Sequence, residues 1–185
     1  YEAFGFTPPQ FGHMPLILGP DGAKLSKRHG GVAVEEYRKE GFLPESLMNY
    51  LILLGWFPGE EHEILTREEA VKLFDISHMS DVQAKFDIQK LRWLNSEYIM
   101  QKPDAELLPL VKARLAAAGI DPSGIAEEYL AKVLVLYKVR LKTLNDFPAM
   151  TDSFFRDEFV LEEEGKAQLE KPESREFLAA LADRL

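Results

Sequence analysis

The chain has 185 residues, of which 46% are hydrophobic and 29% are charged. This composition excludes an intrinsically disordered chain, and the absence of cysteine excludes disulfides, thiolate zinc sites and cysteine nucleophiles. The formal net charge of −9 argues against a protein that coats nucleic acid without specificity.

The first expected elements are a strand, a turn and a loop. Residues 14–18 form a short apolar run, and Gly19-Pro20-Asp21-Gly22 is a strong turn sequence. Residues 24–31 are basic and end in two glycines, which let the backbone approach a ligand closely. The start of the chain therefore predicts a strand that leads into a basic loop.

Helical periodicity dominates the rest of the chain and predicts a mainly α protein with one or two short strands near its start. The expected helices cover residues 32–40, 44–54 and 67–74, residues 88–99 after the cap Asp87, a segment from Pro103 to Gly119, residues 123–144, and a segment that begins at Pro172. Trp93 is expected in the core because it lies beside two leucines of its helix. The position of Trp56, in a loop, is left open.

The negative charge is unevenly distributed. Residues 1–81 carry 7 basic and 13 acidic side chains, and residues 144–185 carry 5 basic and 11 acidic ones. Residues 82–143 carry 10 basic and 7 acidic side chains, so this block is the best candidate to bind a phosphate backbone. Lysines on helices are more often simply solvated, and the charge pattern alone does not decide between the two. The four histidines are scattered, and no metal site is expected.

The segment Lys24-Leu25-Ser26-Lys27-Arg28 places three permanent cations and a hydroxyl in five residues, and no acidic residue occurs from 22 to 34. Ammonium groups act as mobile point charges, while a hydroxyl and loop amides donate directional hydrogen bonds, so this loop suits a polyphosphate. An exposed basic turn is the alternative. A P-loop is excluded because the G-x-x-x-x-G-K spacing is absent.

This segment resembles the KMSKS signature of class I aminoacyl-tRNA synthetases, in the KLSKR form. The flanking sequence is similar to bacterial-type glutamyl-tRNA synthetases over about residues 9–144. The matching stretches are His13–Gly22, Glu35–Arg38, Leu43–Glu45, Asn49–Leu51, Leu54–Trp56, Phe86–Ile88, Lys90–Leu91, Trp93–Asn95, Tyr98–Ile99 and Arg140–Leu144. A lone KLSKR would be weak support, but the ordered series of matches is specific.

The resemblance implies that the loop binds the phosphates of ATP during adenylate formation. Lys27 would stabilise the charge that develops on pyrophosphate, supported by Lys24 and Ser26. Arg28 would complete the phosphate site, and Leu25 would pack the loop. ATP and Mg²⁺ are the implied cofactors of the full-length enzyme, with no metal site in the protein itself.

The resemblance also implies a domain order: a remnant of the catalytic domain over 1–31, a stem-contact domain over 32–101 and an incomplete helical anticodon-binding domain over 102–185. The HIGH signature of class I enzymes is absent, and both ends of the chain are apolar. We therefore expect a piece of a longer protein that is inactive alone. The parent would be a monomeric cytoplasmic ligase that attaches glutamate to tRNA(Glu) at the expense of ATP, without membrane contact.

The candidate tRNA contacts are Lys138, Arg140 and Lys142, of which the two lysines are i,i+4 neighbours on the expected helix. Two alternatives stay open. One is a non-catalytic helical module that binds tRNA or a protein. The other is a relative of glutaminyl-tRNA synthetase, although that enzyme builds its anticodon-binding region from β-barrels, whereas residues 103–185 here have helical patterns.

Overall fold

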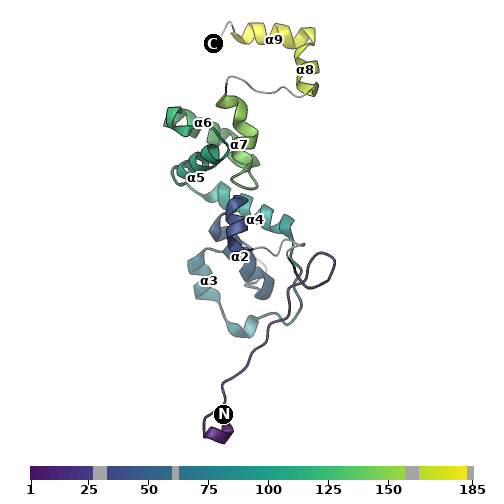
Figure 1. Ribbon diagram of the computed structural model, residues 1–185, viewed down its shortest axis with the longest axis vertical. Coiled ribbons are helices and arrows are strands. Elements are labelled where there is room, and N and C mark those ends of the chain that lie inside the picture. The colour runs from purple at the N-terminus through teal and green to yellow at the C-terminus, as the bar shows by residue number, and fades with distance from the viewer. Residues whose placement is uncertain (27–32, 60–62, 157–162, 183–185) are drawn as a thin grey trace. The chain divides into compact units, whose positions relative to one another are not determined.

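The computed structural model describes residues 1–26, 33–59, 63–156 and 163–182 (Figure 1). Within these ranges the protein is mainly helical, as predicted, and β-pairing is confined to isolated bridges. The chain divides into two compact units, Tyr1–Met150 and Thr151–Leu185, which are described separately below. None of the described helices combines the length and the apolar character that a membrane span requires.

The helices of the first unit follow the predicted order. They are α1 (Val34–Lys39), α2 (Pro44–Gly55), α3 (Arg67–Leu73), α4 (Ile88–Gln101), α5 (Asp104–Ala117) and α6 (Glu127–Tyr137), and α7 (Asp146–Thr151) runs to the unit boundary. Capping explains their ends. Thr66 and Glu69 form a reciprocal capping box at α3, and the Asp87 carboxylate accepts the first backbone N–H groups of α4. Gly119 ends α5 in the left-handed conformation, with φ of 78°.

The expected helix over 123–144 is shorter than predicted. Helix α6 ends at Tyr137, and Lys138–Arg140 form a single 3₁₀ turn, η5. The reason lies further along the chain: the Asp146 carboxylate accepts hydrogen bonds from the backbone N–H groups of Lys142 and Thr143, each at 2.8 Å. In a continuing helix, those N–H groups would bind backbone carbonyls four residues earlier. The Asp146 side chain binds them instead, so residues 142–143 are not helical.

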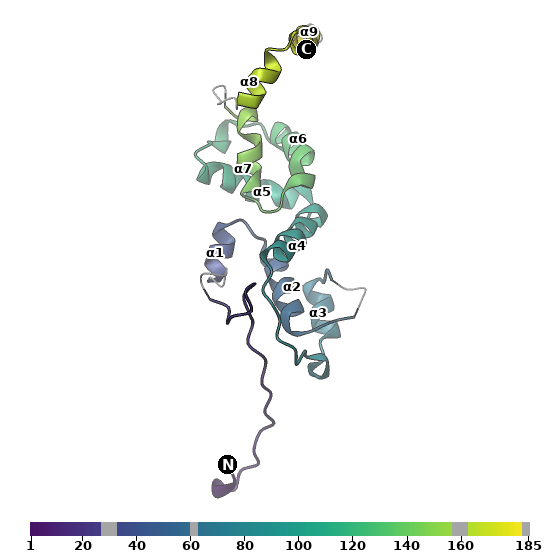
Figure 2. The same cartoon turned by 90° about the vertical axis from the view of Figure 1, so that its right-hand side faces the viewer.

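Helices α2 and α4 lie side by side in both ribbon views (Figures 1 and 2) and form the first core. Their buried cluster consists of Tyr37, Phe42, Leu47, Tyr50, Phe86, Leu91 and Leu94. The Tyr50 hydroxyl accepts a hydrogen bond from the backbone N–H of Asp87 at 2.6 Å, and burial raises the pKa of Tyr50 to about 12. The core therefore also fixes the residue that caps α4.

The structure places the two tryptophans in different environments. Trp93 is 38% exposed, so its prediction as a core residue is wrong. The buried face of α4 carries Leu91 and Leu94, and a residue two positions after Leu91 lies about 200° around the helix from it. Trp56 is buried in a small cluster beside α3, and its indole N–H donates to the backbone carbonyl of Asp75.

A buried polar joint connects α4 with the segments on either side of it. The Asn95 side chain is fully buried, and its carbonyl oxygen accepts hydrogen bonds from the Leu43 backbone N–H at 2.8 Å and the Ser46 hydroxyl at 2.6 Å. Its amide group donates to the backbone carbonyl of Lys142 at 2.6 Å. Because buried polar groups are costly without partners, this residue specifies the register of three segments.

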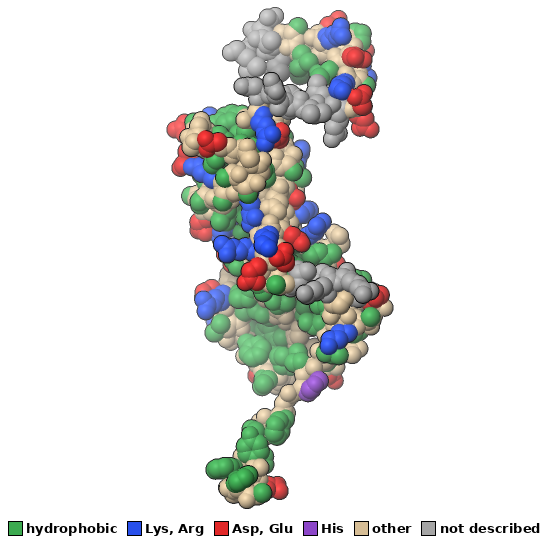
Figure 3. Space-filling view, viewed as in Figure 1, with side chains coloured by type: hydrophobic (Ala, Val, Ile, Leu, Met, Phe, Trp, Pro, Cys, Tyr) green, Lys and Arg blue, Asp and Glu red, His purple; other side chains and the backbone are tan. Residues whose placement is uncertain are grey.

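Helices α5 and α6 pack together, and each has fully buried apolar side chains: Leu107, Val111 and Leu115 of α5, and Leu130 and Leu134 of α6. Leu141 and Phe147, further along the chain, are also fully buried. By contrast, the first residues of the chain leave large apolar side chains exposed, as the space-filling view shows (Figure 3). Tyr1, Phe4, Phe6 and Phe11 are 63–83% exposed. The described residues therefore leave this N-terminal apolar surface uncovered.

The second unit consists mainly of two short helices that pack against each other, α8 (Glu163–Leu169) and α9 (Pro172–Ala182). Pro172 is the first residue of α9, as the sequence predicted, because proline is well suited to a first helical turn. Phe177 and Leu178 are exposed and line a shallow hollow on this pair.

Candidate functional site

The basic loop begins at a small set of backbone pairings centred on Leu18. On one side, Gly19 N–H donates to Ala23 and Leu25 N–H donates to Ile17, which makes a tight hairpin. On the other side, Leu18 N–H donates to Ala84, and Phe86 N–H donates back to Leu18. The hairpin and the segment before α4 thus hold the same short stretch from both sides.

The strand expected over residues 14–18 is correspondingly reduced. Only Leu18 forms bridges, antiparallel with Lys24 and parallel with Lys85. Among the described residues, none pairs with the backbone of residues 14–16, and a strand exists only where a neighbouring strand supplies the ladder. The predicted turn is confirmed: Gly22 has φ of 78°, and its N–H donates to the Gly19 carbonyl at 3.0 Å.

The first residues of the KLSKR segment, which follow this hairpin, are alternately exposed and packed. Leu25 packs against the core cluster of α2 and α4, while Lys24 and Ser26 are exposed. Within the described part of the chain, no carboxylate lies within ion-pair distance of the Lys24 ammonium. Because Leu25 packs inward, Lys24 and Ser26 on either side of it face the solvent. Lys27 and Arg28 lie outside the described residues.

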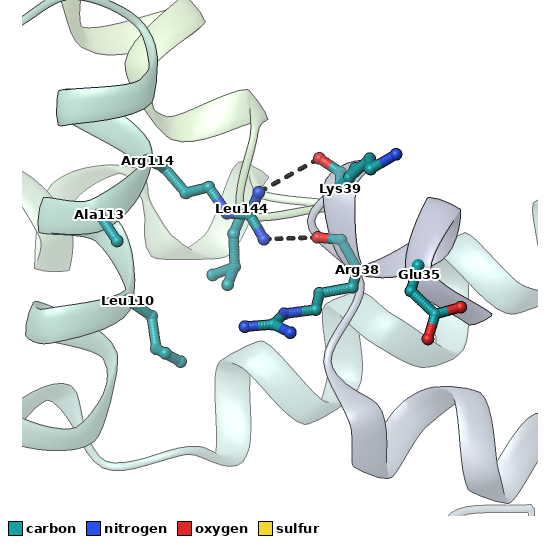
Figure 4. A pocket seen from close by; sticks show the side chains of 7 residues that line it. All are labelled: Glu35, Arg38, Lys39, Leu110, Ala113, Arg114 and Leu144. Carbon is teal, nitrogen blue, oxygen red and sulfur yellow. Dashed lines mark hydrogen bonds between the residues drawn. The ribbon is translucent and has the colours of Figure 1, made fainter. Parts of the chain in front are cut away.

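The first described element after the loop is α1, and its C-terminal end contacts α5 (Figure 4). The Arg114 guanidinium donates to the backbone carbonyls of Arg38 at 2.6 Å and Lys39 at 3.2 Å. Burial and the neighbouring cation Arg38 lower the pKa of Arg114 from its ordinary value. These side chains, with Leu110 and Leu144, line a hollow of about 500 Å³.

Lys138, a candidate tRNA contact, is engaged inside the fold. Its side chain is 13% exposed, and its ammonium binds the Asp104 carboxylate and the Lys102 carbonyl, both at 2.6 Å. Lys102 belongs to the same cluster: burial opposes its charge, but hydrogen bonds to Glu45 and Glu106 raise its pKa overall. These lysines hold α5 against its neighbours.

Arg140 and Lys142, the other two candidates, line a hollow of about 460 Å³ together with Arg92. Arg140 lies over the Tyr137 ring, 5.6 Å from its centroid, and the Lys142 ammonium donates to the Ser96 hydroxyl at 3.3 Å. Lys138 does not line this hollow, so the three candidates are not one site. The sequence reading missed Arg92, which could have been found as the exposed neighbour of the buried Leu91 on α4.

The hollow holds charges of both signs. Glu40 and Asp146 also line it, and Asp146 is occupied by two backbone N–H groups. The hollow therefore suits a phosphate group, which can accept hydrogen bonds from arginine and lysine, better than it suits a cation. Among the described residues, no three His, Asp or Glu side chains converge as they would around a metal ion.

Comparisons with known proteins give a consistent picture. The family model described as "tRNA synthetases class I (E and Q), catalytic domain" matches residues 1–93, and "Anticodon binding domain" matches residues 105–185. A glutamate–tRNA ligase of Aquifex aeolicus is 43% identical over 187 residues, which is 100% of this chain and 39% of that protein. Glutamate–tRNA ligase 1 of Fervidobacterium nodosum is 43% identical over 170 residues, 92% of this chain and 35% of that protein.

A solved structure agrees with these matches. The crystal structure of a glutamate tRNA ligase from Elizabethkingia meningosepticum, in complex with its amino acid, superposes with a TM-score of 0.84 at 30% identity. The superposition covers 99% of this chain and 39% of that one. The chain thus spans little more than a third of the length of these relatives.

Proposed function

The chain belongs to the class I tRNA synthetases for glutamate and glutamine, and we propose that the protein containing it activates glutamate with ATP and joins it to tRNA(Glu). The relatives at about this level of identity are named glutamate–tRNA ligases, which favours glutamate over glutamine as the substrate. We place this protein in the cytoplasm, where ATP and tRNA are available.

The observation that carries the proposal is the placement of Lys24-Leu25-Ser26. Leu25 packs against the core, and its own N–H and the residues before it are paired with residues 17–19. Lys24 and Ser26, on either side of it, are exposed. In adenylate formation the carboxylate attacks the α-phosphorus and pyrophosphate leaves with growing negative charge. A preorganised cation at that charge lowers the barrier selectively.

In this proposal Lys27 stabilises the leaving pyrophosphate, with Lys24 and Ser26 in support and Arg28 on the outer phosphates. ATP supplies the energy of the phosphoanhydride bond. Mg²⁺ would arrive on the phosphates of ATP, and we assign it no ligand in this chain, since the described residues offer no cluster of carboxylates and imidazoles.

We also propose a role for each segment of the chain. Residues 1–31 end the catalytic domain, residues 32–101 contact the tRNA stem, and residues 102–185 belong to the anticodon-binding region. Arg140 and Lys142, joined by Arg92, are the proposed phosphate contacts, because these cations share one open hollow. Lys138 is assigned to the fold instead, because Asp104 and a backbone carbonyl already occupy its ammonium.

The test is glutamate-dependent exchange of pyrophosphate into ATP by the full-length protein, assayed with tRNA(Glu) present. We expect exchange with glutamate, little with glutamine, and a rate equal to buffer for the 185-residue chain alone. Exchange with glutamine only would replace the proposal with a glutaminyl enzyme. Binding of tRNA without any exchange would favour a non-catalytic module.

A further inference from the structure

Helix α1 is too short to hold its own position. It spans Val34–Lys39, six residues, whereas isolated helices below about 12 residues are marginal in water. Tyr37 gives it one buried contact with the core of α2 and α4. The remaining support comes from side chains and backbone groups that meet its C-terminal end.

The C-terminal carbonyls of α1 are bound by residues far along the chain. Arg114 of α5 donates to the carbonyls of Arg38 and Lys39, and the Asn145 amide donates to Lys39 at 2.8 Å (Figure 4 shows the Arg114 bonds). Helix C-termini carry unpaired carbonyls and partial negative charge, so a guanidinium is the best-suited partner. Arg114 thus acts as a cap supplied by a different helix.

Gly41 shows how closely this end of α1 is held. It has φ of 88°, its carbonyl accepts a hydrogen bond from Leu144 N–H at 2.9 Å, and a Cβ added to it would lie 2.8 Å from the Asn145 backbone nitrogen. Only glycine fits both the left-handed backbone and this contact. The turn after α1 is therefore docked against residues 144–145.

These contacts bear on the phosphate loop because α1 follows it directly. Lys27 lies seven residues before Val34, so the fixed start of α1 limits the reach of the loop to about 25 Å. On the upstream side, Leu25 packs against the core. The loop therefore lies between two anchored segments, and the downstream one depends on α5.

We propose that Arg114 is a positioning residue for adenylate formation: by capping α1 it fixes the downstream anchor of the ATP-phosphate loop. This inference rests on the proposed function. In this proposal Arg114 acts through α1, whose carbonyls it binds. Misplacement of a catalytic group by about 1 Å can cost about 10²-fold in rate. Since the loop cations act on charge that develops in the transition state, the loss falls on kcat more than on the KM for ATP.

Lys112 provides a matched control on the same helix. Its ammonium binds the Glu127 carboxylate of α6 at 2.6 Å, and in the described part of the chain no hydrogen bond or ion pair joins it to α1. Replacing Lys112 by alanine removes a cross-helix ion pair, as Arg114→Ala removes a cross-helix cap. A general weakening of α5 would therefore appear in both variants.

The experiment compares Arg114→Ala, Arg114→Lys and Lys112→Ala in the full-length protein by glutamate-dependent pyrophosphate exchange. We expect Arg114→Ala to lower kcat about tenfold or more with less than a threefold change in the KM for ATP. Arg114→Lys keeps one charged donor and should recover part of the loss, and Lys112→Ala should match the wild type. Exchange by Arg114→Ala within twofold of wild type, or equal losses in Arg114→Ala and Lys112→Ala, would overturn the inference.

Amide hydrogen exchange over residues 34–42 separates this inference from the proposed function. Arg114→Ala should accelerate exchange there, whereas Lys112→Ala should not. Unchanged protection in Arg114→Ala would also refute the cap. If the wild-type protein performs no pyrophosphate exchange, the proposed function fails, and the amide measurement still decides whether Arg114 holds α1.

Discussion

Lys24, at the start of the basic loop, and several cations of the helical region differ in what they contact. Lys24 is exposed and has no acidic partner in the described part of the chain, whereas Lys102, Arg114 and Lys138 are bound by carboxylates or backbone carbonyls. Lys24 remains available to a ligand, and the cations of the helical region hold helices together. The partners of a cation, rather than the count of cations, therefore decide what a basic segment can do.

This comparison changes the meaning of the net basic block over residues 82–143. Several of its cations are neutralised inside the fold, and Lys90 and Lys112 pair with Glu63 and Glu127 at the surface. Arg92, Arg140 and Lys142 share a hollow instead. A tRNA contact would thus use a small part of the positive charge in this block.

The largest expected effect comes from the loop. Lys27→Ala in the full-length protein should lower the rate of adenylate formation about 10²- to 10³-fold, because a donor to the leaving phosphates is lost. The midpoint of urea unfolding should stay that of the wild type. The rate of adenylate formation is measured in single turnover, and the affinity for tRNA is measured in parallel. Equal losses of rate and affinity would mean that the loop mainly holds tRNA.

The opposite pattern is expected for Lys138. Lys138→Met should lower the free energy of unfolding by about 1–3 kcal/mol, because the Asp104 carboxylate and the Lys102 carbonyl lose their shared donor. Affinity for tRNA should not change. Urea unfolding checks the first point, with Lys132→Met, an exposed lysine of α6, as the control. Wild-type stability in Lys138→Met, together with weaker tRNA binding, would reverse the assignment.

The smallest effect tests the hollow. Arg140→Ala should leave stability within about 0.5 kcal/mol of wild type, as for most surface changes, and should reduce the slope of log affinity against log salt by about 1. Titration of tRNA(Glu) at several salt concentrations measures this slope. A slope identical to that of the wild type would remove Arg140 from the proposed phosphate contacts. Arg140 would then, like Lys138, have no role in tRNA binding.

Local signals in the sequence predicted the helical fold well. The capping box at Thr66, the cap at Asp87 and the glycine after α5 each act within a few residues, so their sequence neighbourhood contains the needed information. The exposed setting of Lys24 and the packing of Leu25 were also accessible, since alternation of polar and apolar residues marks them.

The features that could not be predicted depend on distant residues. Helix α6 ends early because the Asp146 side chain binds backbone N–H groups three and four residues before it. The spacing of Lys138 and Lys142 therefore no longer places them on one helix face. Trp56 is buried in a cluster with Leu65 and Ala70, which lie further along the chain. The cap that Arg114 gives to α1 joins residues whose proximity no local pattern indicates.

The pairing of Leu18 with the segment around Lys85 has a consequence for folding order. The two partners are separated in the chain by α1, α2 and α3, so this pairing has to close a long loop, whereas each of those helices forms from contacts between near neighbours. We expect the base of the basic loop to form late, after the local helices and once Phe86 has joined the core. During synthesis, the base of the basic loop would then remain unformed until well after it has left the ribosome.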